Sequence, residues 1–222
     1  MGGPRHVVAV EVDLTITATP QSDDLRFFAL QASFADRTTS YGAGHLGLQW
    51  ISWHPGMTAV NWGGYYSPGS GQAGELPGTV ATLPSAVNNV NSRDFAWSAG
   101  IAYRLSIERG IEGWAGIVTD LSTGNRTVVR DLISRGDRLT SVVMWSEIFA
   151  PCEGPEVEVR WSEPRWIDVD GVSHPVPQVQ LSYQSVADGG CSNTSTVVEG
   201  SAVVQRSATP RTNAQDSVLH LG

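Results

Sequence analysis

Residues 6–18 read HVVAVEVDLTITA, and this stretch indicates the fold. Val10, Val12, Leu14 and Ile16 fall on alternate positions. Because successive side chains of a strand point to opposite faces, the pattern predicts a β-strand with one buried face. The same signal recurs along the chain, so we expect further strands over residues 25–35, 44–53, 101–109, 113–120, 126–132, 139–149, 156–162, 178–185 and 195–206.

Turn signals separate these stretches. Residues 122–125 read STGN and the pair Asp170-Gly171 follows a strand pattern, so both predict hairpin turns. No stretch sustains the apolar spacing of a packed helix. The sequence therefore predicts an all-β chain with two antiparallel sheets packed as a jelly-roll β-sandwich, and very little helix.

We expect one domain over residues 1–222, because β-sandwiches of this length are common. Within it, residues 54–98 are rich in Gly, Pro, Ser and Asn and predict a long irregular loop segment. Such a segment either carries binding groups or covers its own aromatic side chains. Residues 208–222 predict a loose tail, in which residues 217–221 could close the sheet as a last strand.

The charge balance restricts the partners. There are 22 acidic and 14 basic residues, for a net charge of −8, which disfavours binding to nucleic acid. All the basic residues are Arg, which excludes Schiff-base lysine chemistry and is typical of a G+C-rich bacterial genome. No apolar run could span a membrane and no signal-peptide pattern opens the chain. We expect a secreted or extracytoplasmic bacterial protein in its mature form.

Two cysteines are too few for a zinc cluster, and Cys152 and Cys191 lie far from a C-x-x-C spacing. A disulfide between them is the simplest interpretation, and a pair of buried free thiols is the alternative. No cofactor and no metal site are expected, because the histidines form no ligand pair. Asp168 and Asp170 lack the other ligands of a calcium loop, and a structural calcium elsewhere is left open.

Three motifs resemble the opening strands of a bacterial family of unknown function with a concanavalin-like sandwich. They are FFALQ at residues 27–31, GHLGLQW at residues 44–50 and AVNWG at residues 59–63. The resemblance extends from Leu25 to Trp166, and His45 stands where that family has an aromatic residue. Lectins and glycan-cleaving enzymes share this fold, so the resemblance implies a saccharide or other small polar ligand, by analogy of fold alone.

Strand alternation sorts the polar side chains by sheet face. If Phe28 and Leu30 face the core, Gln31 faces outward. If Leu46 and Leu48 face the core, their neighbours His45 and Gln49 also face outward. We expect a ligand site on a concave sheet, roofed by loop aromatics, formed by Gln31, His45, Gln49, Trp62, Tyr65, Trp145 and Arg160. Glycan binding at this site is the first hypothesis.

An enzyme on the same face is the second hypothesis. A glycoside hydrolase would use Glu147 and Glu158 as paired carboxylates. A polysaccharide lyase would use His45 or a Tyr as base, with Gln49 or Arg160 neutralising a uronate carboxylate. A protein-interaction module is the third hypothesis, and an ordinary surface ion pair is the alternative interpretation of Glu158 and Arg160.

Overall fold

The computed structural model describes residues 6–222. Strands dominate this part of the chain, and its helices are the 3-10 turns η1 (Pro55–Met57) and η2 (Val186–Asp188). The strands are β1 (Val7–Ile16), β2 (Arg26–Ala35), β3 (Ser40–Trp50), β4 (Thr58–Tyr66), β5 (Ser92–Asp94), β6 (Ala102–Arg109), β7 (Trp114–Asp120), β8 (Arg126–Leu132), β9 (Arg138–Ile148), β10 (Glu158–Asp168), β11 (Ser173–Pro175), β12 (Gln178–Gln180), β13 (Ser195–Glu199), β14 (Ala202–Arg206) and β15 (Val218–His220).

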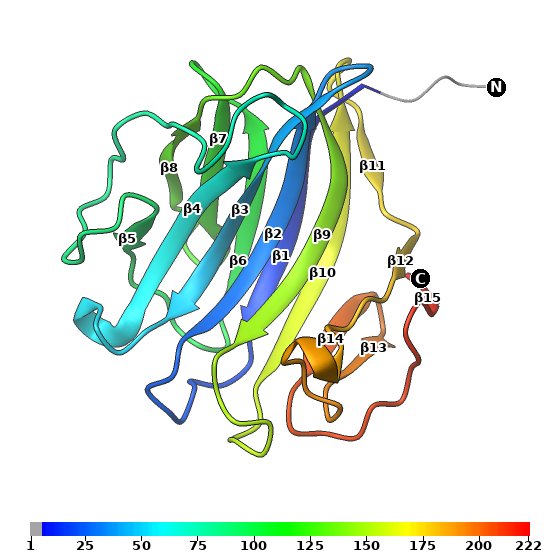
Figure 1. The fold of residues 1–222 in the computed structure, drawn as a ribbon. Coiled ribbons are helices and arrows are strands. Elements are labelled where there is room, and N and C mark those ends of the chain that lie inside the picture. The colour runs from blue at the N-terminus through cyan, green and yellow to red at the C-terminus, as the bar shows by residue number, and fades with distance from the viewer. Residues whose placement is uncertain (1–5) are drawn as a thin grey trace.

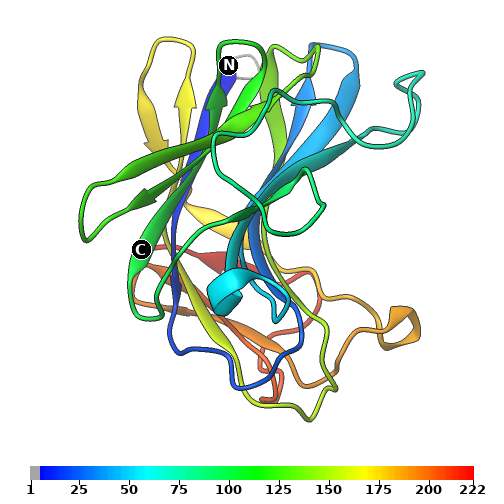
Figure 2. The ribbon, with the colours of Figure 1, turned by 90° about the vertical axis from the view of Figure 1, so that its left-hand side faces the viewer.

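Two antiparallel sheets pack face to face (Figure 1). One has five strands in the order β5-β4-β3-β2-β9. The other has eight, in the order β13-β14-β10-β1-β6-β7-β8 with β11 paired to β10. Strands β12 and β15 form a small separate pair beside them. Figure 2, turned by a right angle, shows the two layers side by side, and the predicted sandwich is confirmed.

The core lies between the inner faces of the two sheets. Phe28, Leu30 and Phe34 of β2 point into it, as do Leu46 and Leu48 of β3, and each is at most 2% exposed. The predicted alternation on these two strands is therefore confirmed. Burying such side chains contributes about 1.5–3 kcal/mol each, which explains why the strict period of two sets the register.

Three tryptophans are fully buried in the core: Trp62, Trp114 and Trp161. Trp62 was expected to roof a ligand site, and this prediction is wrong, because its side chain is 0% exposed. The indole of Trp62 lies against Gly116 of the opposite sheet, where an added Cβ would come within 2.5 Å of Trp62 Cγ. Trp62 Nε1 donates to the carbonyl oxygen of Trp114 at 3.3 Å. The side chain joins the sheets and contacts no solvent.

Residues 58–66 were expected to be irregular, but they form β4, between β3 and β5. The glycines that suggested a loop have a packing role in the strand. A Cβ at Gly64 would lie 2.2 Å from the carbonyl oxygen of Ala43, and one at Gly63 would lie 2.7 Å from Asn91. Glycine in a strand often marks such a close approach, so the composition was misleading.

The C-terminal region also differs from its prediction. Residues 195–206 form a hairpin of β13 and β14 that turns at Gly200, whose φ is 63°. Residues 178–185 contain only the short β12. The tail contributes β15, which pairs with β12 and not with either large sheet. Both predicted hairpins are confirmed, because Gly124 links β7 to β8 and Gly171 links β10 to β11 with positive φ.

The predicted disulfide is confirmed. Cys152 and Cys191 are bonded, with their Cα atoms 5.5 Å apart and a sequence separation of 39. The bond joins the β9–β10 loop to the loop before β13.

Replacing Trp62 tests its structural role. Trp62→Ala should lower the free energy of unfolding by about 3–5 kcal/mol, because it leaves a cavity between the sheets. The matched control is Trp53→Ala, since Trp53 is 59% exposed and should change stability by no more than about 0.5 kcal/mol. Urea unfolding followed by circular dichroism measures both, and equal effects would contradict the assignment.

Removing the disulfide should also destabilise the fold. The double variant Cys152→Ala, Cys191→Ala should lose about 4 kcal/mol, because the unfolded chain regains the entropy of the open loop. Denaturant unfolding of the oxidised protein and the variant measures this loss. A difference near zero would show that the bond does not restrict the unfolded chain in the expected way.

Candidate functional site

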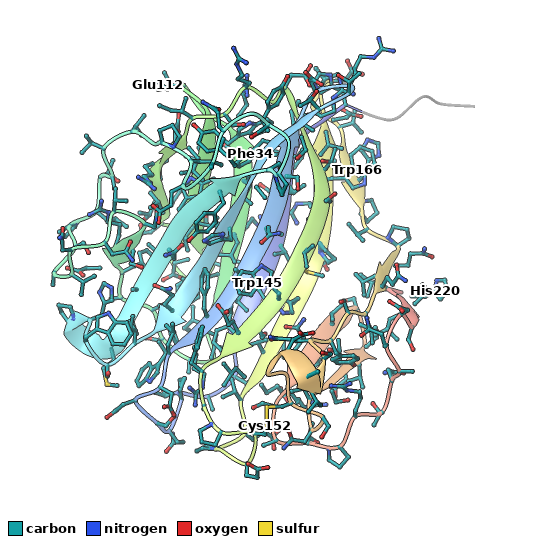
Figure 3. The ribbon with its side chains drawn as sticks, in the orientation of Figure 1. Phe34, Glu112, Trp145, Cys152, Trp166 and His220 are labelled. Carbon is teal, nitrogen blue, oxygen red and sulfur yellow. A yellow bond between two sulfur atoms is a disulfide. The ribbon has the colours of Figure 1, made fainter. Side chains whose placement is uncertain are left out.

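The outward face of the five-stranded sheet carries a cluster of four rings. Phe27, His45, Tyr65 and Trp145 come from four neighbouring strands, and we call them the ring cluster. The centroids of Phe27 and Trp145 are 5.0 Å apart with the rings nearly perpendicular. Those of Phe27 and His45 are 5.8 Å apart, and His45 stacks on Tyr65 at 6.1 Å. Figure 3 shows Trp145 at the middle of this sheet.

Strand register explains why these rings meet. Ala29 of β2 pairs with Trp145 of β9 on one side and with Gly47 of β3 on the other. A Cβ at Gly47 would lie 2.7 Å from Phe27 Cε2, so the phenyl ring occupies that space. Small residues at the centre of the face therefore let the larger rings lean together. The pattern follows from alternation once the core face is set.

Polar groups surround the ring cluster. Gln31 pairs directly with His45 across β2 and β3, and Glu147 pairs with Phe27 across β9 and β2. Tyr65 is 56% exposed. The indole Nε1 of Trp145 is buried and has no hydrogen-bond partner among residues 6–222. An unpaired buried N–H of this kind costs the folded state free energy.

Burial shifts two ionisable groups on this face. It lowers the pKa of the His45 imidazole, and the nearby Glu75 carboxylate opposes that shift. Burial also raises the pKa of Glu147. Desolvation disfavours the charged form of either group, which accounts for both directions. His45 is thus a neutral ring that can both donate and accept a hydrogen bond near neutral pH.

Gln49 lies on the expected face but is covered. It is only 6% exposed, and Ser92 Oγ donates to its Oε1 at 3.0 Å. The indole of Trp97 donates to its carbonyl oxygen at 3.0 Å. The prediction of Gln49 as a ligand contact is therefore corrected, because residues 92–97 of the long connection pack over its amide.

Glu158 and Arg160 lie on the other sheet. Both belong to β10, and their outward side chains form ion pairs there. Arg206 Nε donates to Glu158 at 2.6 Å, and Arg160 Nη1 donates to Glu199 at 2.9 Å. Their assignment to the ligand site is wrong. Alternation predicted correctly which way these side chains point from their strand, but it cannot tell which sheet a strand joins.

Two residues of the site were missed. Phe27 had the same parity as Gln31, and that signal was available in the sequence. No sequence signal indicated Glu75, because it belongs to the long connection after β4. An isolated β-bridge between Tyr65 and Glu75 brings its carboxylate close enough to act on His45. The structure therefore brings together Gln31, His45, Tyr65, Trp145 and Glu147 of the predicted set, and adds these two.

Comparison with known proteins identifies no family. No family model matches this chain, and no curated protein matches it. Among solved structures, a crystal structure of scytalido-glutamic peptidase with a peptide-based transition-state analogue aligns with a TM-score of 0.43 and 10% identity, over 90% of this chain and 92% of that one. SCP-B, a member of the eqolisin family of peptidases, in complex with a tripeptide, aligns with a TM-score of 0.44 and 11% identity, over the same shares. Likeness at this level carries no inference about chemistry.

Residues 6–222 contain no group of three His, Cys, Asp or Glu side chains that could hold a metal ion. Asp168, expected at a turn, accepts hydrogen bonds at Oδ1 from the backbone of Asp170 and Val172. In the same part of the chain, no helix has the length and apolar character needed to cross a membrane.

The buried histidine predicts a pH dependence of stability. Because burial lowers the pKa of His45 in the folded state, the unfolded chain takes up a proton more readily. Stability should be full above the ordinary His pKa of about 6.5 and should fall as the pH drops below it. His45→Gln should lose less stability than the wild type over this interval, as measured by urea unfolding.

The control is His220→Gln, which changes an exposed histidine on β15 and should behave like the wild type. Glu147 remains in all three proteins, so its own titration cancels in the comparison. Identical acid sensitivity of the wild type and His45→Gln would contradict the prediction.

Proposed function

We propose that this chain is an exported protein that binds a saccharide through the ring cluster on the outward face of its five-stranded sheet. The observation that carries the proposal is the gathering of four rings with Gln31 and Glu147 on one face. Aromatic faces stack on the apolar faces of pyranose rings, and amide and carboxylate oxygens accept hydrogen bonds from hydroxyl groups.

The charges on this face favour a neutral saccharide over a uronate. Glu147 lies beside the rings, and Glu75 is close enough to act on His45. Arg160, the cation expected to neutralise a carboxylate, belongs to the other sheet. A polyanionic glycan would meet two carboxylates and no compensating charge from the predicted residue.

The disulfide supports export, because such bonds persist mainly in oxidising compartments outside the cytosol. The absence of Lys supports a bacterial source with a G+C-rich genome.

Binding is better supported than glycan cleavage. A hydrolase needs its two carboxyl groups about 5–9.5 Å apart, whereas Glu147 and Glu158 point outward from different sheets of the sandwich. A lyase with His45 as base gains support from the neutral ring, but both partners predicted for the substrate carboxylate are elsewhere engaged: Gln49 with Ser92 and Arg160 with Glu199.

Affinity electrophoresis against a panel of neutral polysaccharides, with a glycan array, tests the proposal. Trp145→Ala and Tyr65→Ala should each weaken binding by roughly three- to tenfold, the loss expected from one aromatic contact of about 0.5–1.5 kcal/mol. Trp53→Ala is the matched control, because it removes an exposed indole outside the cluster. Unchanged retention in both cluster variants would eliminate this face as the binding site.

A further inference from the structure

Strand β9 is the edge of the five-stranded sheet, and its far side has no neighbouring strand within residues 6–222. Phe149 N–H donates to the carbonyl oxygen of Leu25 at 3.0 Å. Because alternate residues of an antiparallel strand direct their N–H and C=O groups to the same side, the backbone groups of the odd-numbered residues 143–149 face β2. Those of Met144, Ser146 and Ile148 face away. The carbonyl oxygen of Met144 accepts from Gln205 Nε2 at 3.3 Å, which agrees with this direction. Among the described residues, the N–H groups of these three have no partner.

A groove runs along this free edge. It has a volume of about 1260 Å³, and residues 139–149 of β9 and its end form one wall. Residues 176–184 form the opposite wall, and Val159 and Val203 contribute to the apolar floor. Figure 1 shows β12 across from β9, beyond β10. The groove exceeds the roughly 300–1000 Å³ typical of small-molecule pockets.

The free edge is only partly protected, by a bulge near one end and by the Gln205 side chain. It is 11 residues long, and residues 139–146 contain neither a charged residue nor a proline. Val142 and Val143 are 47% and 44% exposed. Natural proteins keep edge strands short or charged to prevent pairing with other chains. The bulge at Ser141, with a φ of 49°, limits the regular edge to residues 143–148.

Two other sheet edges of this protein are protected. At the opposite end of the same sheet, β5 is only three residues long. At one end of the eight-stranded sheet, β13 carries Glu199, which accepts hydrogen bonds from Arg160 and Arg206. The contrast indicates that the β9 edge is left open for a partner.

We propose that this groove binds an extended peptide segment of a partner protein, which adds to the five-stranded sheet as a strand beside β9. The peptide backbone would pair with the N–H groups of Met144, Ser146 and Ile148. At Met144 the peptide would also displace the Gln205 amide, whose Nε2 donates to the carbonyl oxygen of that residue. Every second side chain of the peptide would then face the apolar floor, so alternate apolar residues are selected. The net charge of −8 disfavours acidic segments.

The walls of the groove favour a single segment over a second copy of the chain. Residues 176–184 stand opposite β9, and the Cys152–Cys191 disulfide lies at the boundary of the groove and ties its loops together. A whole sheet that approached β9 edge to edge would meet this wall, whereas one extended chain needs about 4.8 Å of width beside the strand.

Selection from a phage-displayed library of random peptides tests the proposal, with peptides of about ten residues at roughly 3.4 Å per residue to span the edge. Selected sequences should carry apolar residues at alternate positions. The synthetic peptide should bind Ser146→Pro about tenfold more weakly than the wild type, because proline removes an N–H that faces the groove and leaves the β2 ladder intact. Ser146→Ala is the matched control, since it keeps the backbone N–H and removes only the hydroxyl group that donates to Gln205 Oε1. It should bind the peptide at least as tightly as the wild type does.

Backbone N-methylation of the selected peptide gives a second readout on the unaltered protein. Methyl groups on one set of alternate residues should abolish binding, and those on the other set should leave it unchanged, because only one set of N–H groups faces β9. Equal binding of the two methylated series would overturn the proposal. So would a selected peptide that binds the wild type no more tightly than it binds Ser146→Pro.

Two further outcomes are decisive. A concentration-dependent dimer that Ser146→Pro abolishes would assign the edge to a second copy and overturn the peptide assignment. If Ser146→Pro does not fold, Val179→Arg on the opposite wall replaces it and should weaken peptide binding about tenfold by placing a charge against the apolar groove.

Discussion

The contact between the inner faces of the two sheets is the constraint on which the other features depend. Phe28 and Leu46 of one sheet must meet the apolar side chains of the other, and Trp62 fits only because Gly116 has no side chain. Since a strand alternates strictly, this burial forces Gln31 and His45 to the outward face. The ring cluster is thus a consequence of core packing as much as of its own contacts.

The unequal size of the sheets creates the second surface. The eight-stranded sheet continues through β14 and β13 beyond the point where the smaller sheet ends at β9. Residues 176–184 cover part of that overhang, and the disulfide joins loops at its margin. A groove remains along β9, so one strand serves both surfaces: Trp145 faces outward with the rings, and the backbone of Met144 faces the groove.

The misplaced site residues have a common cause. Glu158, Arg160 and Gln49 were each placed on the correct side of their own strand. Glu158 and Arg160 were assigned to the wrong sheet. Gln49 was assigned to the correct sheet face, but residues 92–97 cover it. Both depend on pairing between segments far apart in the sequence, such as β10 with β1 and β5 with β4, which local patterns do not encode.

The sequence by itself determined the all-β class, most strand positions, the inward and outward faces of β2 and β3, and the Cys152–Cys191 pairing. These follow from period-two burial, turn chemistry and cysteine count, which are local or compositional. Only the tertiary structure decided that residues 58–66 form a strand, that Glu75 reaches His45, and that β9 has a free edge beside a groove. Each of these depends on which strands become neighbours, and that choice is made by the free energy of the whole packed sandwich.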